Sequence, residues 1–177
     1  MASKLRVDHI EPVDGIPSGG GGGIIQVVST SWNSTTSSTS TSFVEISSNL
    51  RTTITPKFNT SKILVTSCLY TSAVNSRQTY RMYRSIAGGA YGQAPNASAD
   101  GTDNDDGMYN LYTNSEAFMK MNSFTFLDAP ATTGAVIYSP YWSVSGGTIY
   151  MNQDNGGSGT NRGVSTITVM EVSGWAS

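Results

Sequence analysis

The sequence has little charge, one cysteine and one histidine, and these scarcities exclude several classes of protein. Charged residues make up 12% of the 177 residues, about half of the usual share. Cys68 is the single cysteine, so no disulfide can form within the chain and a zinc site lacks its usual ligands. No stretch approaches the ~18 apolar residues of a membrane helix, and the N-terminus has no apolar signal-peptide core. We therefore expect synthesis in a cytoplasm and no membrane insertion.

The net charge of -2 and the scattered positions of the ten Lys and Arg residues argue against nucleic-acid binding. A nucleic-acid-binding domain would show a basic patch or stripe. The most concentrated cations are Arg77, Arg81 and Arg84, which alternate with Tyr80 and Tyr83. This group is interpreted as an outward strand face with flanking packing, so no nucleic-acid partner is expected.

Catalytic constellations are also scarce. His9 is the only histidine, and five glycines (Gly19–Gly23) separate it from the rest of the chain. Catalytic groups need rigid supports, which a flexible tract does not provide. Two carboxylates could form a glycosidase site without histidine, but no spacing marks such a pair. We predict that the protein is not an enzyme, and a carbohydrate-active enzyme is the alternative.

The glycine tract divides the chain into three parts. Glycine loses the most conformational freedom on ordering, so residues 19–23 are predicted to form a hinge. Residues 1–18 form an arm that is too short to fold alone. Residues 24–177 are long enough to bury a core and are predicted to form the displayed domain.

Strand patterns recur through this domain, and helical periodicity is nearly absent. About ten short strands without crossover helices predict an all-β fold, an antiparallel β-sandwich that is jelly-roll-like and carries an extended N-terminal arm. An immunoglobulin-type sandwich is the second choice. Because proline cannot donate to a sheet ladder, Pro56, Pro130 and Pro140 are placed at or beyond strand ends. The hydroxyl-rich segment Ser29–Ser42 is expected to be a solvated connection. The predicted strands are Ile24–Thr30, Ser42–Ser47, Arg51–Thr55, Lys62–Thr71, Thr79–Ile86, Met108–Thr113, Ser123–Leu127, Ala135–Ser143, Thr148–Asn152 and Ser165–Val172.

One acidic segment resembles a metal site in composition. Clustered Asp side chains can supply the six to eight oxygen ligands that calcium takes. The EF-hand spacing fails, however, because Thr102 and Thr113 stand where carboxylates are required. An exposed acidic turn without a cofactor is the favoured interpretation, and a calcium site is the alternative. The acidic residues are Asp100, Asp103, Asp105 and Asp106.

Aromatic residues crowd the middle and later strands. Tyrosine offers a large apolar area with a polar tip, which suits protein interfaces and sugar stacking. The same side chains could also fill the core, and sequence does not separate the two uses. The candidates for receptor or interface contact are Tyr83, Tyr91, Tyr109, Tyr112, Tyr141 and Trp142.

The arm sequence Lys4-Leu-Arg-Val-Asp-His-Ile-Glu-Pro12 resembles the N-terminal tag of bacteriophage tail fibres and related virion appendages, especially those of cyanophages. In that group a Gly/Ser-rich stretch follows the tag, as it does here. The similarity continues in Ile24–Thr30, in Thr52–Pro56 with the following Ser61–Val65, and in Ile167–Val172.

The resemblance implies a virion structural protein, a homotrimer whose arm attaches to other phage virion proteins. Because this chain has no long shaft, it would be a short tail fibre or knob that attaches to the host surface, and a host surface glycan is the expected receptor class. A capsid decoration, cement or head-fibre protein is one alternative, and a calcium-dependent carbohydrate-binding module is another. Alternating apolar side chains would give an extended arm a narrow apolar edge that adds to a partner's sheet. The expected anchoring residues are Leu5, Val7, Ile10 and Pro12.

Overall fold

The computed structural model describes residues 23–95, 107–113, 118–154 and 161–172. The predicted arm, most of the hinge and the acidic segment 100–106 lie outside the described residues. The roles predicted for them therefore stay predictions.

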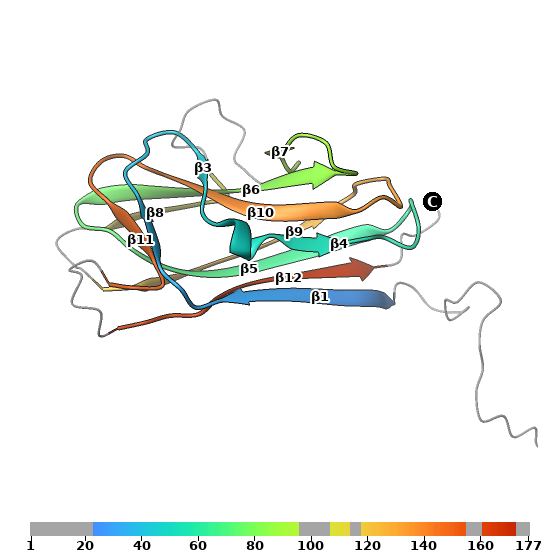
Figure 1. The fold of residues 1–177 in the computed structure, drawn as a ribbon, viewed down its shortest axis with the longest axis horizontal. Coiled ribbons are helices and arrows are strands. Elements are labelled where there is room, and N and C mark those ends of the chain that lie inside the picture. The colour runs from blue at the N-terminus through green and yellow to red at the C-terminus, as the bar shows by residue number, and fades with distance from the viewer. Residues whose placement is uncertain (1–22, 96–106, 114–117, 155–160, 173–177) are drawn as a thin grey trace, which may run out of the picture.

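The described residues form strands and one short 3₁₀ turn (Figure 1). Each predicted strand has a counterpart whose bounds differ by a few residues at most. Two short strands were not predicted, and one of them, β2, lies inside the hydroxyl-rich segment that was expected to be a connection. The elements are β1 (Ile24–Trp32), β2 (Thr36–Ser38), β3 (Val44–Glu45), η1 (Ser48–Leu50), β4 (Thr52–Ile54), β5 (Lys62–Ser72), β6 (Ser76–Ile86), β7 (Gly92–Gln93), β8 (Tyr109–Thr113), β9 (Lys120–Asp128), β10 (Val136–Val144), β11 (Ile149–Met151) and β12 (Ser165–Val172).

The strands form two antiparallel sheets that pack face to face. The first sheet has the order β1-β12-β5-β9, and β11 and β2 extend it beside the end of β5. The second sheet has the order β4-β10-β6-β8, and β3 and β7 pair at its margins. If these eight strands are numbered 1 to 8 along the chain, the first sheet has the order 1-8-3-6 and the second sheet has the order 2-7-4-5. This order is the jelly roll, so the structure confirms the predicted all-β antiparallel sandwich.

The core lies between the sheets and follows from alternation along the strands. In β9, Phe124 and Phe126 are buried while Ser123 and Thr125 are exposed. Such alternation is expected of an antiparallel strand with one solvated face. The largest fully buried side chains are Trp142, Tyr80, Tyr138, Leu50, Ile54, Ile63, Leu69, Met82, Ile149, Met151, Ile167 and Gln78.

Pro140 was expected at or beyond a strand end, and this expectation is wrong because Pro140 lies inside β10. The predicted strand over 135–143 already placed it there. Its carbonyl accepts from the Ile46 amide at 3.0 Å, on the side of β10 away from β6. In an extended strand the nitrogen and carbonyl of one residue point to the same side. The missing N–H therefore faces the gap between β3 and β4, so no hydrogen bond to β6 is lost.

One end of the core contains a polar network instead of aliphatic packing. The Tyr80 hydroxyl donates to Gln78 Oε1 at 2.7 Å, and the Thr71 hydroxyl donates to the same oxygen at 3.0 Å. Asn122 Nδ2 donates to Thr71 Oγ1 at 2.6 Å. All four residues are fully buried, and burial raises the pKa of Tyr80. The network joins β5 and β9 of the first sheet to β6 of the second and gives most of its buried polar atoms a partner. Asn122 Oδ1 has none among the described residues.

Candidate functional site

The outer face of the second sheet gathers aromatic and charged side chains. The odd-numbered residues of β6 and β10 lie on this face, because the even-numbered ones are directed into the sandwich. Tyr141 lies opposite Arg81 on β6 and opposite Glu45 on β3, and Ser139 lies opposite Tyr83. The register of three strands therefore places these side chains in two neighbouring rows.

An ion pair fixes one side of this group. Arg51, which follows η1, donates from Nε and Nη2 to the two Glu45 oxygens, each at 2.7 Å. The Ser139 hydroxyl donates to Glu45 Oε1 at 2.6 Å. The hydrogen bonds from Arg51 hold the pKa of Glu45 below its usual value. The pair is partly exposed and contributes little to stability, but its bidentate geometry orients the guanidinium.

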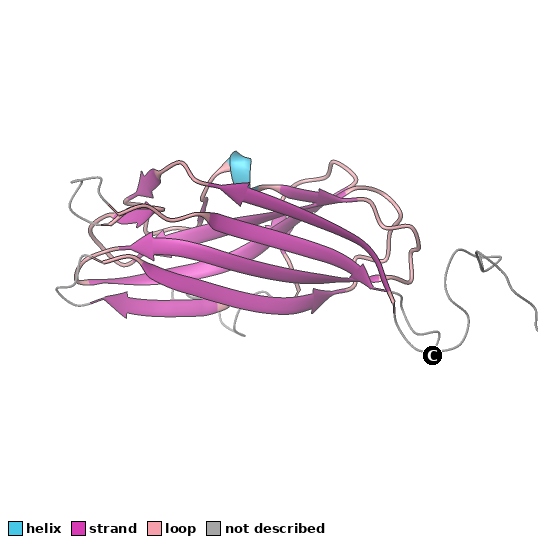
Figure 2. Cartoon of the chain, turned by 90° about the horizontal axis from the view of Figure 1, so that it is seen from below, coloured by secondary structure: helices cyan, strands magenta, loops and turns pink. Residues whose placement is uncertain are grey.

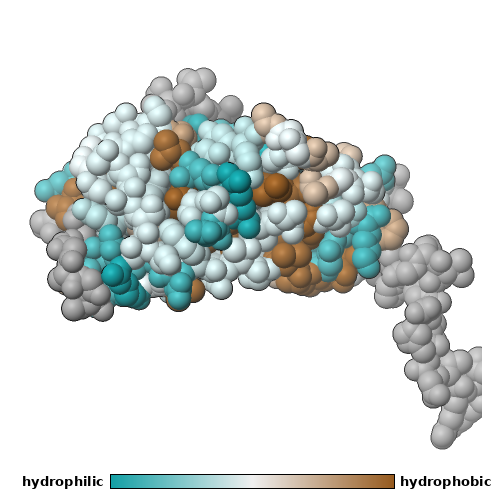
Figure 3. Space-filling view, viewed as in Figure 1, coloured by the Kyte–Doolittle hydropathy of each residue, from teal (hydrophilic) through white to brown (hydrophobic). Residues whose placement is uncertain are grey.

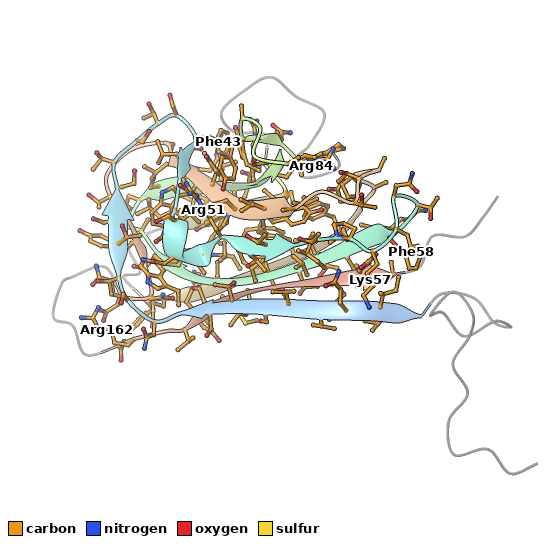
Figure 4. The ribbon with its side chains drawn as sticks, turned by 45° about the vertical axis from the view of Figure 1, so that its right-hand side comes forward. Phe43, Arg51, Lys57, Phe58, Arg84 and Arg162 are labelled. Carbon is orange, nitrogen blue, oxygen red and sulfur yellow. The ribbon has the colours of Figure 1, made fainter. Side chains whose placement is uncertain are left out.

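The aromatic rings complete the surface. The rings of Tyr83 and Tyr141 stack with centroids 4.0 Å apart and planes 24° apart. The Arg51 guanidinium carbon lies 5.0 Å from the centre of the Tyr91 ring. The Arg81 guanidinium carbon lies 3.9 Å from the centre of the Phe43 ring. We call this group the tyrosine–arginine surface; Figure 4 shows two of its members, Phe43 and Arg51, on the same flank of the molecule. Its members are Phe43, Glu45, Arg51, Arg81, Tyr83, Tyr91, Ser139 and Tyr141.

Tyr91 has an unsatisfied hydroxyl within this surface. Its oxygen is buried and has no hydrogen-bond partner among the described residues. Burial raises the pKa of Tyr91 and also that of Tyr141, so both phenols are neutral donors near neutral pH. An unpaired hydroxyl that is buried in this way costs free energy.

The structure brings together three of the six predicted aromatic residues, Tyr83, Tyr91 and Tyr141. Trp142 is a correction, because it is 1% exposed and fills the core. The residue after an outward Tyr141 must be directed inward. Tyr109 is partly buried and packs against Tyr80, with ring centroids 6.1 Å apart.

Tyr112 is isolated from the tyrosine–arginine surface. It is 61% exposed on β8 and lies opposite Arg77, four residues before Arg81 along β6. The arginine group also needs a correction. Arg77 and Arg81 lie on the outer face as expected, but Arg84 is directed into the sandwich, where it pairs with Asp128.

Sequence reasoning missed Phe43, Glu45, Arg51 and Ser139 as members of this surface. Glu45 and Arg51 are six residues apart across η1, and no helical or strand spacing connects them. Phe43 precedes the two-residue β3, so its orientation follows from tertiary structure rather than from a periodic pattern. The only local signal was the alternation of Tyr83 with Arg81.

The described residues contain no group of three or more His, Cys, Asp or Glu side chains that could hold a metal ion. The predicted calcium ligands Asp100, Asp103, Asp105 and Asp106 lie outside the described residues. Within the described part of the chain, no helix is long and apolar enough to cross a membrane.

Comparisons with known proteins gave a structural likeness. No protein-family model matches the chain, and no relative was found among curated proteins. Among solved structures, the chain is similar to a structure of infectious bursal disease virus Gx strain, with a TM-score of 0.40 and 10% identity over 95% of this chain and 44% of that chain. A structure of the Gt strain of the same virus gives a TM-score of 0.43 with the same identity and coverage. The chain thus spans less than half the length of the chains that it matches.

Proposed function

We propose that this chain is a non-enzymatic structural protein of a bacteriophage virion, a short tail fibre or knob that attaches to the host surface. The observation that carries the proposal is the tyrosine–arginine surface on an outer sheet face, which includes the stacked pair Tyr83 and Tyr141. The arm that resembles phage appendage tags supplies the second half of the argument. In this proposal residues 1–18 attach to other virion proteins, and three copies display their sandwich domains outward.

The chemistry of the surface suits a host surface glycan. Tyrosine rings present apolar faces on which the C–H groups of a sugar ring can pack. Arg51 and Glu45 together offer donors and acceptors in a fixed arrangement. A few placed polar groups around aromatic area are typical of small-ligand sites.

Deletion of residues 1–18 is expected to leave a folded, soluble protein that no longer joins virions. The described sandwich begins at β1 and owes its core to residues after the deletion, whereas the arm is proposed to make the attachment. The measurement is the copy number of a tagged chain in purified particles, with circular dichroism of the free protein as a folding check.

A matched pair of arm variants tests whether the arm attaches through its apolar edge or acts only as a spacer. Leu5→Ser with Val7→Ser is expected to lose incorporation, while Arg6→Ser with Asp8→Ser is expected to keep it. A misfolded deletion variant would contradict the anchor role. Gold labelling of the particles then locates the chain, and hundreds of copies over the capsid would favour the decoration alternative.

Tyr83→Ala and Tyr141→Ala are each expected to weaken binding to cells of the propagating bacterial strain by about tenfold or more, since truncating a central contact residue typically costs about 2 kcal/mol. The measurement is binding of the labelled full chain to intact cells over a concentration series. Tyr112→Ala is the matched control, because it removes an exposed tyrosine of the same sheet that lies outside the surface. Equal losses in all three variants would argue against this site.

The same assay tests the calcium alternative. If the tyrosine–arginine surface binds the cells, binding is expected to persist in a chelator, because none of its members is a grouped metal ligand among the described residues. Loss of binding in chelator would instead favour calcium-dependent binding through Asp100, Asp103, Asp105 and Asp106.

A further inference from the structure

The outer face of the first sheet has a composition unlike that of the second. Its four long strands lie side by side (Figure 2), and the register aligns their outward side chains in transverse rows. The rows are Val27-Met170-Leu64-Leu127, then Ser29-Thr168-Thr66-Thr125, then Ser31-Thr166-Cys68-Ser123, followed by Tyr70-Met121. We call these residues the neutral face.

The neutral face contains no charged side chain within these rows. Lys62 is the one charged residue that the alternation places on the same side of the four strands, and it lies at their end, opposite Val172. An uncharged face forms no ion pair with a charged partner, and its removal from water costs little free energy. Three of its apolar members are well exposed, with Val27 at 54%, Met121 at 56% and Leu127 at 43%. Figure 3 shows apolar residues gathered over the beginning of β1 at the margin of this face.

The hydroxyl rows also lower the cost of burying this face. The Ser29 and Thr168 hydroxyls lie 2.9 Å apart and hydrogen-bond to each other. The Thr66 and Thr125 hydroxyls do the same at 3.2 Å. Hydroxyls that pair across strands keep a partner when water leaves, so burial of the middle rows leaves few orphan polar groups.

The size of the face is sufficient for a specific contact. Four strands about 4.8 Å apart and about seven residues of ~3.4 Å each give a surface of ~19 by ~24 Å. Three surfaces of this size that meet around one axis bury on the order of 1,400 Å² in total, which is in the range of specific interfaces.

The position of the arm indicates which partner covers the face. β1 is an edge strand of this sheet, and its first residue, Ile24, is 61% exposed and pairs with Val172 at the end of the face. Copies that pack through the neutral face around an axis along the strands would start their arms at one end of the assembly. That arrangement suits three arms that attach at one point on a virion.

We infer that the neutral face packs against another copy of this chain and forms the main contact of the assembly. This inference rests on the homotrimer proposed above and assigns its contact to the first sheet. It leaves the tyrosine–arginine surface, on the opposite side of the sandwich, free for the host.

Thr66→Lys tests the inference, because Thr66 lies in the middle row between Thr168 and Thr125. The mass of the full chain is measured by light scattering during gel filtration over a range of concentrations. The wild type is expected to be an oligomer, and Thr66→Lys is expected to raise the dissociation constant at least 100-fold. Thr53→Lys is the matched control: it places the same charge on an exposed position of β4 in the second sheet and is expected to keep the wild-type mass.

Two further measurements keep the inference falsifiable. Thr125→Lys introduces the same charge at an exposed position of the edge strand β9, where a lysine is expected to disturb folding least. Maleimide labelling of Cys68, the single cysteine, is expected to be slow in the wild-type oligomer and faster in both lysine variants on this face. If the wild type is an oligomer and both folded lysine variants keep its mass and its labelling rate, the inference is overturned. The proposed homotrimer is not contradicted by that result. A monomeric wild type overturns both, and particle incorporation still tests the virion role.

Discussion

Replacing Asp128 by alanine is expected to lower the free energy of unfolding by about 3 kcal/mol, because it leaves a largely buried arginine unpaired. Asp128 ends β9 of the first sheet and is 2% exposed. Its carboxylate accepts from the Arg84 guanidinium on β6, and from the Tyr138 hydroxyl on β10 at 2.7 Å. It also accepts from the Ala129 amide at 2.8 Å. One side chain therefore ties the end of the first sheet to the two central strands of the second.

A double replacement distinguishes the cost of the orphaned charge from the cost of lost packing. Asp128→Leu combined with Arg84→Met removes both charges and keeps most of the volume, so it is expected to recover a large part of the stability lost in Asp128→Ala. Unfolding in urea, followed by circular dichroism at one fixed protein concentration, gives the free energies. The ion-pair explanation would be contradicted if the double variant lost as much free energy of unfolding as Asp128→Leu and Arg84→Met lose together as single variants, or more.

The sheets could be predicted from sequence because alternation is a local property. In β12, the spacing of two residues between Ile167 and Val169 places both on one face, and both are buried. The same rule says that Tyr141 and Trp142 are directed to opposite faces, but it does not say which faces the core. That choice depends on what covers each side, namely the opposing sheet for Trp142 and the segment around Arg51 for Tyr141.

Polar residues that serve the core could not be predicted in this way. A charged side chain is expected to face water, so Arg84 was grouped with the outward Arg77 and Arg81. Its inward direction depends on Asp128, which lies 44 residues away. The short strands β2 and β7 have three and two residues, too few for a periodic signal. They exist because β11 and β6 offer them edges to pair with. Tertiary structure also brings together the members of the tyrosine–arginine surface, so only its tyrosines were predicted from sequence.

Glu171 is the other buried carboxylate whose replacement is expected to have a large effect. It is fully buried on β12, on the inward face that it shares with Ile167 and Val169. Gln26 Nε2 donates to one oxygen at 2.6 Å. The amides of Lys57 and Phe58 donate to the other at 2.8 and 3.3 Å.

These two amides belong to the segment that crosses from β4 in the second sheet to β5 in the first, and that segment lies at the end of the sandwich away from Arg51 (Figure 4). Glu171→Ala removes the acceptor, but Gln26 Nε2 keeps its hydrogen bond to the Thr55 carbonyl at 2.7 Å. The variant leaves two partly buried amides unsatisfied, those of Lys57 and Phe58, each of which costs about 1 to 3 kcal/mol. Relaxation and entering water recover part of this, so we expect a loss of about 3 kcal/mol. The amides of Lys57 and Phe58 should also exchange with solvent faster than in the wild type, measured by hydrogen exchange.

Glu45→Ala is the informative control, because it removes a carboxylate that does have an arginine partner. Counting ion pairs would predict a greater loss at Glu45 than at Glu171. The physical argument predicts the reverse: the Glu45–Arg51 pair is partly exposed, and such pairs contribute about 0 to 1 kcal/mol. Equal destabilisation by the two variants, or unchanged exchange of the Lys57 and Phe58 amides in Glu171→Ala, would contradict the role of Glu171 in holding the crossing segment.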